Sequence, residues 1–166
     1  DLYCMEIITK SAQDTQNLGK KIGSYLIHEF LPEQQLSGAA VITLSGPLGS
    51  GKTTFVKGIA KGFGISARIL SPTYTFIRAH ETSHGYRLVH IDLYRLQNEN
   101  DLPDLGISEL LIPAKNIVII EWPQKAKKLL PHKRIDIAFS VLEGEKHRLE
   151  IVNTLSKDLP VNQYDK

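Results

Sequence analysis

The most informative stretch of the sequence is the octapeptide Gly46-Pro47-Leu48-Gly49-Ser50-Gly51-Lys52-Thr53. It matches the pattern G-x-x-x-x-G-K-[ST] without a gap, and it lies between an apolar run at 39–45 and an amphipathic segment at 52–63. A strand, a glycine-rich turn and a helix in this order are typical of a phosphate-binding loop. The glycines let consecutive backbone N–H groups point at phosphate oxygens, and the helix N-terminus adds a positive potential. The octapeptide therefore predicts a site for a nucleoside triphosphate.

The side chains at the end of this loop have separate expected roles. Lys52 can reach the outer phosphates as a point charge, and the Thr53 hydroxyl can be a ligand of Mg²⁺. The other loop residues expected to contact the phosphates are Gly46, Leu48, Gly49, Ser50, Gly51 and Thr54. A dinucleotide-binding loop would need the spacing G-x-G-x-x-G, which the residues after Gly51 do not provide. No N-K-x-D sequence for guanine recognition is present, so we expect ATP rather than GTP.

The composition of the chain fits one soluble domain. It has 166 residues, of which 42% are hydrophobic and 23% charged, and its formal net charge is +2. This balance lacks the strong basic excess of a dedicated nucleic-acid binder. Cys4 is the only cysteine, so no internal disulfide can form, and no apolar run approaches the ~18 residues of a membrane span. We therefore expect a cytoplasmic protein without a membrane partner, with one domain at 5–153 and a loose tail at 154–166.

The periodicity of apolar residues predicts a three-layer α/β architecture. Helices are expected at 11–32, 52–63 and 123–130, and strands at 5–8, 39–45, 74–78, 86–92, 117–121, 135–141 and 147–152. The nearly continuous apolar run at 39–45 suits a central strand that is covered on both faces. The last two strands alternate in polarity across a turn at Glu143 and Gly144. We expect a mixed, mainly parallel central sheet with an antiparallel C-terminal edge.

Two carboxylates follow strand-like apolar runs and are the candidate acids of the site. Asp92 follows the run at 88–91, and Glu121 follows the run at 117–120. In a doubly wound sheet the carboxyl ends of the strands face the ligand crevice. Phosphoryl transfer needs a metal ligand and a group that orients the attacking water, and the residues alone leave open which acid has which task. For each acid, the alternative is that it only caps a neighbouring helix.

The segment Ser71-Pro72-Thr73-Tyr74-Thr75 lies between the helix at 52–63 and the next strand. Its hydroxyl groups could contact the terminal phosphate, as the hydroxyls of a switch loop do. A polar turn fixed by Pro72 is the alternative.

Three further features are assigned no role in the site. His80 and His84 are expected to be solvated loop residues, because no third metal ligand lies nearby in the sequence. Trp122 is expected to pack in the core. The basic stretch at 125–134 is expected to be a solvated helix face, and docking to an acidic partner or an RNA backbone is the alternative.

Five motifs stand in order along the chain: GPLGSGKTT at 46–54, SPTYTF at 71–76, HIDLYRL at 90–96, Gly106-Ile107 at a helix start and EWPQKA at 121–126. Together they resemble the TsaE (YjeE) family, the small bacterial ATPases of tRNA threonylcarbamoyladenosine biosynthesis. The resemblance covers roughly residues 5–142. It implies a P-loop NTPase-like fold with an unusual strand order, and the hydrolysis of ATP with Mg²⁺ in the cytosol.

The same resemblance assigns roles to individual residues. Lys52 is implied to hold the phosphates, and Asp92 is implied to be needed for hydrolysis. Thr53 and Glu121 match the family's metal ligands. Thr73 and Thr75 fall in the family's switch-like loop and are expected to contact the nucleotide.

The resemblance also implies partners. The implied partners are the TsaB and TsaD proteins, which modify the adenosine next to the tRNA anticodon. TsaE-like proteins are thought to hydrolyse ATP on that complex and to reset it between turnovers, so tRNA would be engaged only indirectly.

Two other classes of protein share the phosphate-binding loop. A small-molecule or nucleotide kinase would need a second substrate pocket and usually a lid that carries arginines, but Arg78, Arg87 and Arg95 are spread over predicted strands. A nucleotide-gated binding module would respond to ATP without turnover of its own. Phosphorylated products would identify the kinase, whereas docking that depends on ATP without phosphate release would identify the module.

Overall fold

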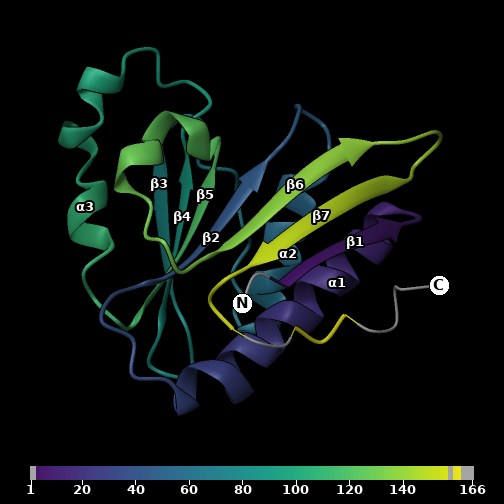
Figure 1. Ribbon diagram of the computed structural model, residues 1–166, viewed down its shortest axis with the longest axis horizontal. Coiled ribbons are helices and arrows are strands. Elements are labelled where there is room, and N and C mark those ends of the chain that lie inside the picture. The colour runs from purple at the N-terminus through teal and green to yellow at the C-terminus, as the bar shows by residue number, and fades with distance from the viewer. Residues whose placement is uncertain (1–2, 157–158, 162–166) are drawn as a thin grey trace.

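The computed structural model describes residues 3–156 and 159–161, and within them seven strands form a single sheet. The strands are β1 (Tyr3–Thr9), β2 (Ala40–Ser45), β3 (Ile77–Glu81), β4 (Arg87–Asp92), β5 (Asn116–Glu121), β6 (Ile135–Val141) and β7 (His147–Asn153). Their order across the sheet is β1-β7-β6-β2-β5-β4-β3 (Figure 1). The strands β6, β2, β5 and β4 pair in parallel, and the three outer pairs are antiparallel. The predicted mixed sheet is therefore confirmed, and its parallel part lies in the centre.

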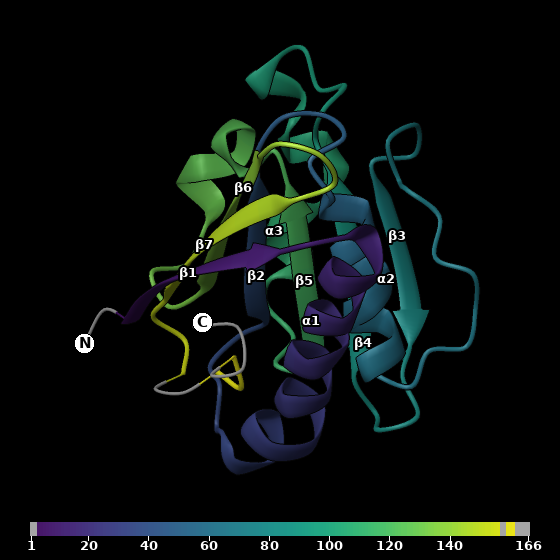
Figure 2. The same cartoon turned by 90° about the vertical axis from the view of Figure 1, so that its right-hand side faces the viewer.

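The C-terminal hairpin of β6 and β7 is antiparallel, as expected, but it does not form the edge of the sheet. β7 pairs with β6 on one side and with β1 on the other, so that Met5 lies opposite Ile151 (Figure 2). The outer backbone N–H and C=O groups of β7 are thereby bonded to the N-terminal strand. The alternation of apolar residues identifies each strand, but it does not identify which distant strand lies beside it.

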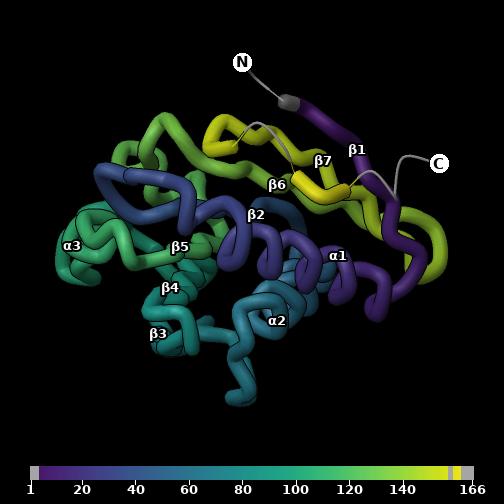
Figure 3. Tube along the Cα trace, turned by 90° about the horizontal axis from the view of Figure 1, so that it is seen from below, coloured from purple at the N-terminus to yellow at the C-terminus, as the bar shows by residue number. Residues whose placement is uncertain are grey.

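Helical segments cover both faces of the sheet, which confirms the three layers. The helices α1 (Ala12–Tyr25) and α2 (Lys52–Gly62) pack against each other on one face (Figure 3). After α1, a π-helical turn (Leu26–Phe30) and a 3-10 turn (Leu31–Glu33) carry helical geometry one residue past Pro32. The other face is covered by α3 (Ile107–Leu110) and by the 3-10 segments η4 (Pro103–Leu105) and η5 (Pro123–Leu129). The 3-10 segment η3 (Glu99–Asp101) has no buried residue.

Alternate residues of the central strands belong to two separate apolar layers. On β2, Ile42 lies in the layer beneath α1 and α2, whereas Val41 lies in the layer beneath α3. On β5, Ile119 and Ile120 are divided in the same way. All four side chains are fully buried. This confirms the prediction that the run at 39–45 forms a central strand covered on both faces.

The helices α1 and α2 approach each other backbone to backbone. A Cβ atom on Gly58 of α2 would lie 2.1 Å from the carbonyl oxygen of Gln16 of α1, so only glycine permits this contact. Ser11 caps the N-terminus of α1 by accepting a hydrogen bond from the N–H of Asp14. The close contact fixes the position of α2, whose first turn follows the phosphate-binding loop.

The strand predicted at 74–78 is wrong in its position, because β3 begins only at Ile77. The N–H of Thr75 bonds the carbonyl of Pro72 in a turn, and Phe76 has a φ of 60°, in the left-handed region. The carbonyl of Phe76 accepts a hydrogen bond of 2.8 Å from the N–H of Asp92, but the register of β3 with β4 begins only at Ile77. The segment 71–76 is therefore a loop throughout its length.

Two predictions about the C-terminal part of the chain are also corrected. The helix expected at 123–130 is the 3-10 segment η5, which is interrupted by the non-helical φ and ψ of Ala126. The tail is not loose where the structure describes it, because Leu159 and Val161 are buried in the layer beneath α1 and α2. Residues 157–158 and 162–166 of the expected tail lie outside the described residues.

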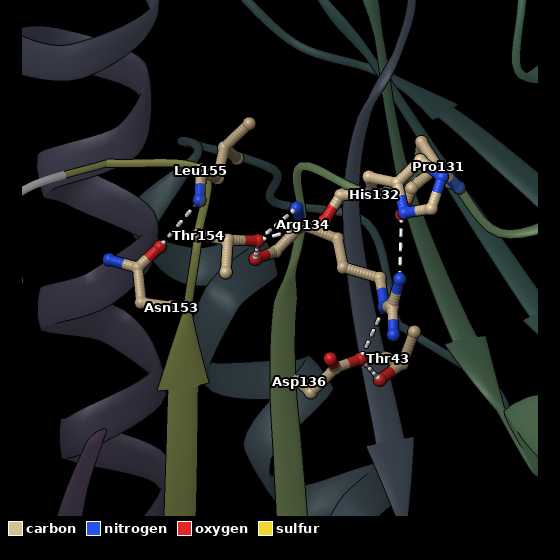
Figure 4. A network of polar contacts seen from close by, with 8 residues as sticks. All are labelled: Thr43, Pro131, His132, Arg134, Asp136, Asn153, Thr154 and Leu155. Atoms are coloured by element: carbon tan, nitrogen blue, oxygen red, sulfur yellow. Dashed lines mark hydrogen bonds and ion pairs between the residues drawn. The ribbon is translucent and has the colours of Figure 1, made fainter. Parts of the chain in front are cut away.

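A network of polar contacts joins the start of β6 to β2 and to the end of β7 (Figure 4). The guanidinium of Arg134 donates to the carboxylate of Asp136 at 2.8 Å and to the carbonyl of Pro131 at 2.7 Å. Asp136 also accepts a hydrogen bond from the Thr43 hydroxyl of β2, and the Arg134 N–H donates to the Thr154 hydroxyl. Arg134 is thus committed to the fold. The expectation of a solvated basic face does not hold for this residue.

Candidate nucleotide-binding site

A cavity of about 330 Å³ lies between the phosphate-binding loop and the carboxyl ends of β4 and β5. It is lined by residues from distant parts of the chain: Ala12, Leu48, Gly49, Ser50, Gly51, Lys52, Thr53, Thr54, Ser71, Thr73, Asp92, Glu121, Trp122 and His147. The sheet order explains this assembly, because β2 is paired with β5 and β5 with β4. The loop after β2 therefore lies at the same edge of the sheet as the end of β5, its neighbour, and the end of β4, one strand further on.

The phosphate-binding loop connects β2 to α2, as the octapeptide predicts. Gly51 caps the N-terminus of α2 with a φ of 96°. Gly46 has a φ of 131°, and a Cβ atom there would lie 2.5 Å from the carbonyl oxygen of Phe139 on β6. Only glycine allows the chain to leave β2 so close to β6. The loop is thus seated against the parallel part of the sheet.

Lys52 lies inside the loop and is only 6% exposed. Its ammonium donates to the carbonyl oxygens of Gly46 and Pro47, each at 2.7 Å, and to the Ser50 hydroxyl at 3.4 Å. Burial lowers the pKa of Lys52, although the negative charges of the two nearby carboxylates act in the opposite direction. All its hydrogen bonds to neutral oxygens can be exchanged for bonds to phosphate oxygens. The role that the sequence predicts for Lys52, binding of the outer phosphates, stays a prediction.

Asp92 is buried at the end of β4, with an exposed fraction of 4%. One carboxylate oxygen accepts a hydrogen bond from the Thr73 hydroxyl at 2.7 Å, and the other accepts one from the N–H of Tyr94 at 2.9 Å. Thr73 also shares a hydrogen bond of 2.7 Å with the Ser71 hydroxyl. The structure therefore connects the loop at 71–73 to the candidate acid. Thr75 is exposed and does not line the cavity.

Glu121 is buried at the end of β5, with an exposed fraction of 3%. Its Oε2 lies 3.3 Å from Nε2 of His90, whose side chain is 1% exposed. His90 Nδ1 has no hydrogen-bond partner. This pairing is consistent with the tautomer in which Nε2 carries the hydrogen and donates it to Glu121. His90 thereby orients the carboxylate from within the core.

The oxygen atoms around the cavity fit a magnesium–triphosphate ligand. The Thr53 hydroxyl and the carboxylates of Asp92 and Glu121 all line the cavity, and oxygen is the donor that Mg²⁺ prefers. Among the described residues, no three His, Cys, Asp or Glu side chains are grouped closely enough to enclose a metal ion. Mg²⁺ in nucleotide sites usually needs only one or two carboxylates, since phosphates and water complete its shell.

A family model described as "Threonylcarbamoyl adenosine biosynthesis protein TsaE" matches residues 9–149. The chain belongs to the TsaE family. The proteins named "tRNA threonylcarbamoyladenosine biosynthesis protein TsaE" from Treponema pallidum and Aquifex aeolicus are 35% and 34% identical to it. These matches span 83% and 88% of this chain, and 93% and 94% of the relatives.

The crystal structure of YdiB from Bacillus subtilis supports the fold. It covers 99% of this chain and 91% of its own with a TM-score of 0.67, at 22% sequence identity. The resemblance of the five motifs to TsaE is therefore confirmed for the family and for the α/β fold. In the part of the chain that the structure describes, no helix is both long and apolar enough to cross a membrane.

Three residues that line the candidate nucleotide cavity were not expected there from the sequence. Trp122 packs against the apolar layer beneath α3, as expected, but it is only half-buried, and its ring centre lies 5.2 Å from the Lys52 ammonium. Its φ of 58° is left-handed, which turns the chain sharply after Glu121. His147 reaches the cavity from the start of β7 and Ala12 from the start of α1, so neither carries a local signal.

His90 could have been found from the TsaE motif HIDLYRL. It lies two residues before Asp92, and residues two apart in a strand point to the same face of the sheet. The sequence therefore indicates that His90 and Asp92 lie on the same face of the sheet. The pairing of β4 with β5 then brings Glu121 beside them.

The remaining polar features lie outside the cavity. His84 is exposed in a loop, as expected, but His80 lies on β3 and is half-buried. Burial lowers the pKa of His80, and the neighbouring His90 and Arg78 act in the same direction. From the basic stretch, Lys125 is half-buried rather than freely solvated, and its ammonium donates to the carbonyls of Tyr94 and Leu96 at 2.6 and 2.8 Å. These two bonds join the EWPQKA and HIDLYRL motifs.

Proposed function

We propose that this chain is an ATPase that uses Mg²⁺ and supports tRNA threonylcarbamoyladenosine biosynthesis. The proposal rests on one observation: the lysine of the phosphate-binding loop and two buried carboxylates from adjacent strands line the same cavity. The names of the relatives supply the pathway. A kinase would need a second substrate pocket beside this cavity, and nothing in its lining suggests one.

Lys52 and the backbone of the loop would bind the β- and γ-phosphates. Thr53 and Glu121 would hold Mg²⁺, which supplies positive charge that offsets the charge of the phosphates when it is bound. Asp92 would orient the attacking water and accept a proton from it. The water oxygen would form a bond to the γ-phosphorus, the bond from the γ-phosphorus to the bridging oxygen would break, and ADP and inorganic phosphate would leave. Asp92 already accepts two hydrogen bonds, and a carboxylate can accept more, so it can also accept one from the water.

We further propose that the protein acts in the cytoplasm with the TsaB and TsaD proteins and meets tRNA only through their complex. Thr73 contacts Asp92, so a ligand at the acid would change the contacts of the segment 71–76. A segment with different contacts in two nucleotide states can act as a switch. ATP would favour docking onto TsaB and TsaD, and hydrolysis would release the subunit.

The test is phosphate release from ATP, measured with and without TsaB and TsaD, together with analysis of the products. We expect ADP and phosphate in equal amounts from the wild type. Lys52→Ala should reduce turnover by at least ~10²-fold, because the ammonium no longer offsets the negative charge of the outer phosphates. Lys128→Ala removes an exposed lysine and is the matched control.

The proposal is contradicted by wild-type turnover in Lys52→Ala, or by a phosphorylated product in place of free phosphate. Docking that depends on ATP without any phosphate release, even on the complex, would instead identify a nucleotide-gated binding module.

A further inference from the structure

A second cavity, of about 430 Å³, lies between α1, α2 and the segment 65–69. Its lining shares no residue with that of the nucleotide cavity: Gln16, Lys57, Ala60, Lys61, Ile65, Ser66, Ala67, Arg68 and Ile69. The segment 65–69 belongs to the stretch between α2 and β3, which runs along the outside of the molecule (Figure 2). The cavity is larger than the candidate nucleotide site and has no role in the proposed hydrolysis.

The charge of this cavity is wholly positive. Lys57, Lys61 and Arg68 line it, and no acidic residue does. None of the three forms an ion pair within residues 3–156 and 159–161. Lys61 donates to the neutral side-chain oxygen of Gln16 at 2.7 Å, which leaves its charge uncompensated. An anionic ligand would therefore gain attraction without displacing an existing ion pair.

Besides these cations and the polar side chains of Gln16 and Ser66, the cavity has apolar walls. Ala60 is buried, as are Ile65 and Ile69, and all three line the cavity. No aromatic residue lines it, so there is no platform on which nucleic-acid bases could stack. The net charge of only +2 also gives little of the broad positive surface that tracks a phosphate backbone. The combination favours a ligand that carries both carboxylates and an apolar group.

We propose that this cavity docks an acidic segment of a protein partner, with an apolar side chain between the two helices and the 65–69 segment. Its carboxylates would face Lys57, Lys61 and Arg68. Rim charges of this kind set the choice of partner and the rate of association. The proposal does not depend on ATP hydrolysis by the chain.

The position of the cavity connects the two sites along the chain. Ile69 is followed after one residue by Ser71, whose hydroxyl bonds Thr73, which in turn bonds Asp92. An acidic segment bound against 65–69 would restrain the end of the loop that reaches the nucleotide. The docking partner and the nucleotide would thus contact opposite ends of one continuous loop.

The test uses fluorescence anisotropy with a short labelled peptide in which one leucine is flanked on both sides by glutamates. A second peptide has glutamine in place of each glutamate. We expect the wild type to bind only the glutamate peptide, and more weakly at high salt. Lys57→Glu combined with Arg68→Glu should weaken binding by about tenfold or more, because two attractions become repulsions.

The matched control is Lys127→Glu combined with Lys128→Glu, which changes the charge equally at two exposed lysines of η5. It should leave peptide binding unchanged, and both double variants should keep the wild-type affinity for ATP. If Lys57→Glu with Arg68→Glu does not fold, Lys57→Gln with Arg68→Gln takes its place, because it removes the two positive charges without adding negative ones.

Several results would overturn the proposal. These are failure of the wild type to bind the glutamate peptide, equal binding of the glutamine peptide, and equal losses in the two double variants. Binding of a single-stranded RNA, lost in the variant at Lys57 and Arg68 while the peptide is ignored, would assign the cavity to nucleic acid instead.

Discussion

Asp92 and Glu121 are direct register partners at the carboxyl ends of the adjacent parallel strands β4 and β5. Both are buried, and each is held by a different neighbour: Asp92 by Thr73, and Glu121 by His90. The pairing brings two like charges together near the buried ammonium of Lys52, whose pKa both of them act to raise. Because their neighbours differ, substitutions of the two acids should have different effects.

Asp92→Ala should separate ATP binding from hydrolysis. The phosphate-binding loop is intact in this variant, so it should bind ATP and dock onto TsaB and TsaD, while phosphate release falls by at least ~10²-fold. Nucleotide affinity, complex formation and modified tRNA formed per protein measure the three steps. Asp104→Ala, at an exposed acid in η4, is the control. Normal multiple-turnover modification by Asp92→Ala would disprove the assigned role.

His90→Ala should raise the Mg²⁺ concentration needed for nucleotide binding by about tenfold, because residues that orient a metal ligand contribute on this scale. Calorimetric titration of ADP at several Mg²⁺ concentrations measures this without reference to turnover. His90→Gln keeps a side-chain N–H that can donate to Glu121, and it should recover much of the loss. Equal defects in both variants, or a defect that is independent of Mg²⁺, would indicate that His90 acts only by filling the core.

The segment 71–76 should become more protected from amide hydrogen exchange when ATP and Mg²⁺ are added. Thr73→Val keeps the shape of the side chain but removes the hydroxyl that donates to Asp92, so it should reduce the protection. Thr75→Val is the comparison, because Thr75 is exposed and outside the cavity. If ATP leaves exchange in this segment unchanged in the wild type, the switch is absent.

The ligand-free protein should gain stability from Lys52 as the pH rises toward 10.5. Burial lowers the pKa of this lysine below 10.5 in the folded state, so the unfolded chain binds the proton more tightly. The free energy of unfolding therefore increases as the pH passes upward from the lowered pKa to 10.5, and below that window the gain is absent. Urea unfolding of the wild type and of Lys52→Met over this range isolates the effect. Identical pH profiles for the two proteins would refute it.

Gly58→Ala should destabilise the protein by about 3 kcal/mol, because the new Cβ atom would lie 2.1 Å from a backbone oxygen of α1 and the two helices must separate. Gly144→Ala has open space around the new atom and meets only the strain of a φ of 68°, so it should cost about 1 kcal/mol. Thermal unfolding of both variants gives the comparison. A smaller loss at Gly58 than at Gly144 would mean that α1 and α2 can slide apart freely.

The sequence predicted the parts of the site that depend on local order. The octapeptide at 46–53 required a strand before it and a helix after it, and the structure has both. Asp92 and Glu121 could be placed because each ends an apolar run, and such ends meet at one edge of a parallel sheet.

The parts that were missed depend on contacts between distant segments. No local pattern indicates that Lys125 bonds the carbonyls of Tyr94 and Leu96, or that His147 reaches the phosphate-binding loop. In each case the two segments meet only because the sheet order brings them together.

The pairing of β1 with β7 bears on how the chain folds during synthesis. Of the seven strands that the structure describes, β1 is made first, yet its partner β7 is made last. Contacts so far apart in sequence form slowly, and an unpaired strand is prone to aggregate in the meantime. A chaperone that shields the nascent N-terminal strand would therefore be most needed before β7 is complete. A stop codon anywhere between β6 and β7 would leave β1 without its partner in the sheet and β6 with an open side.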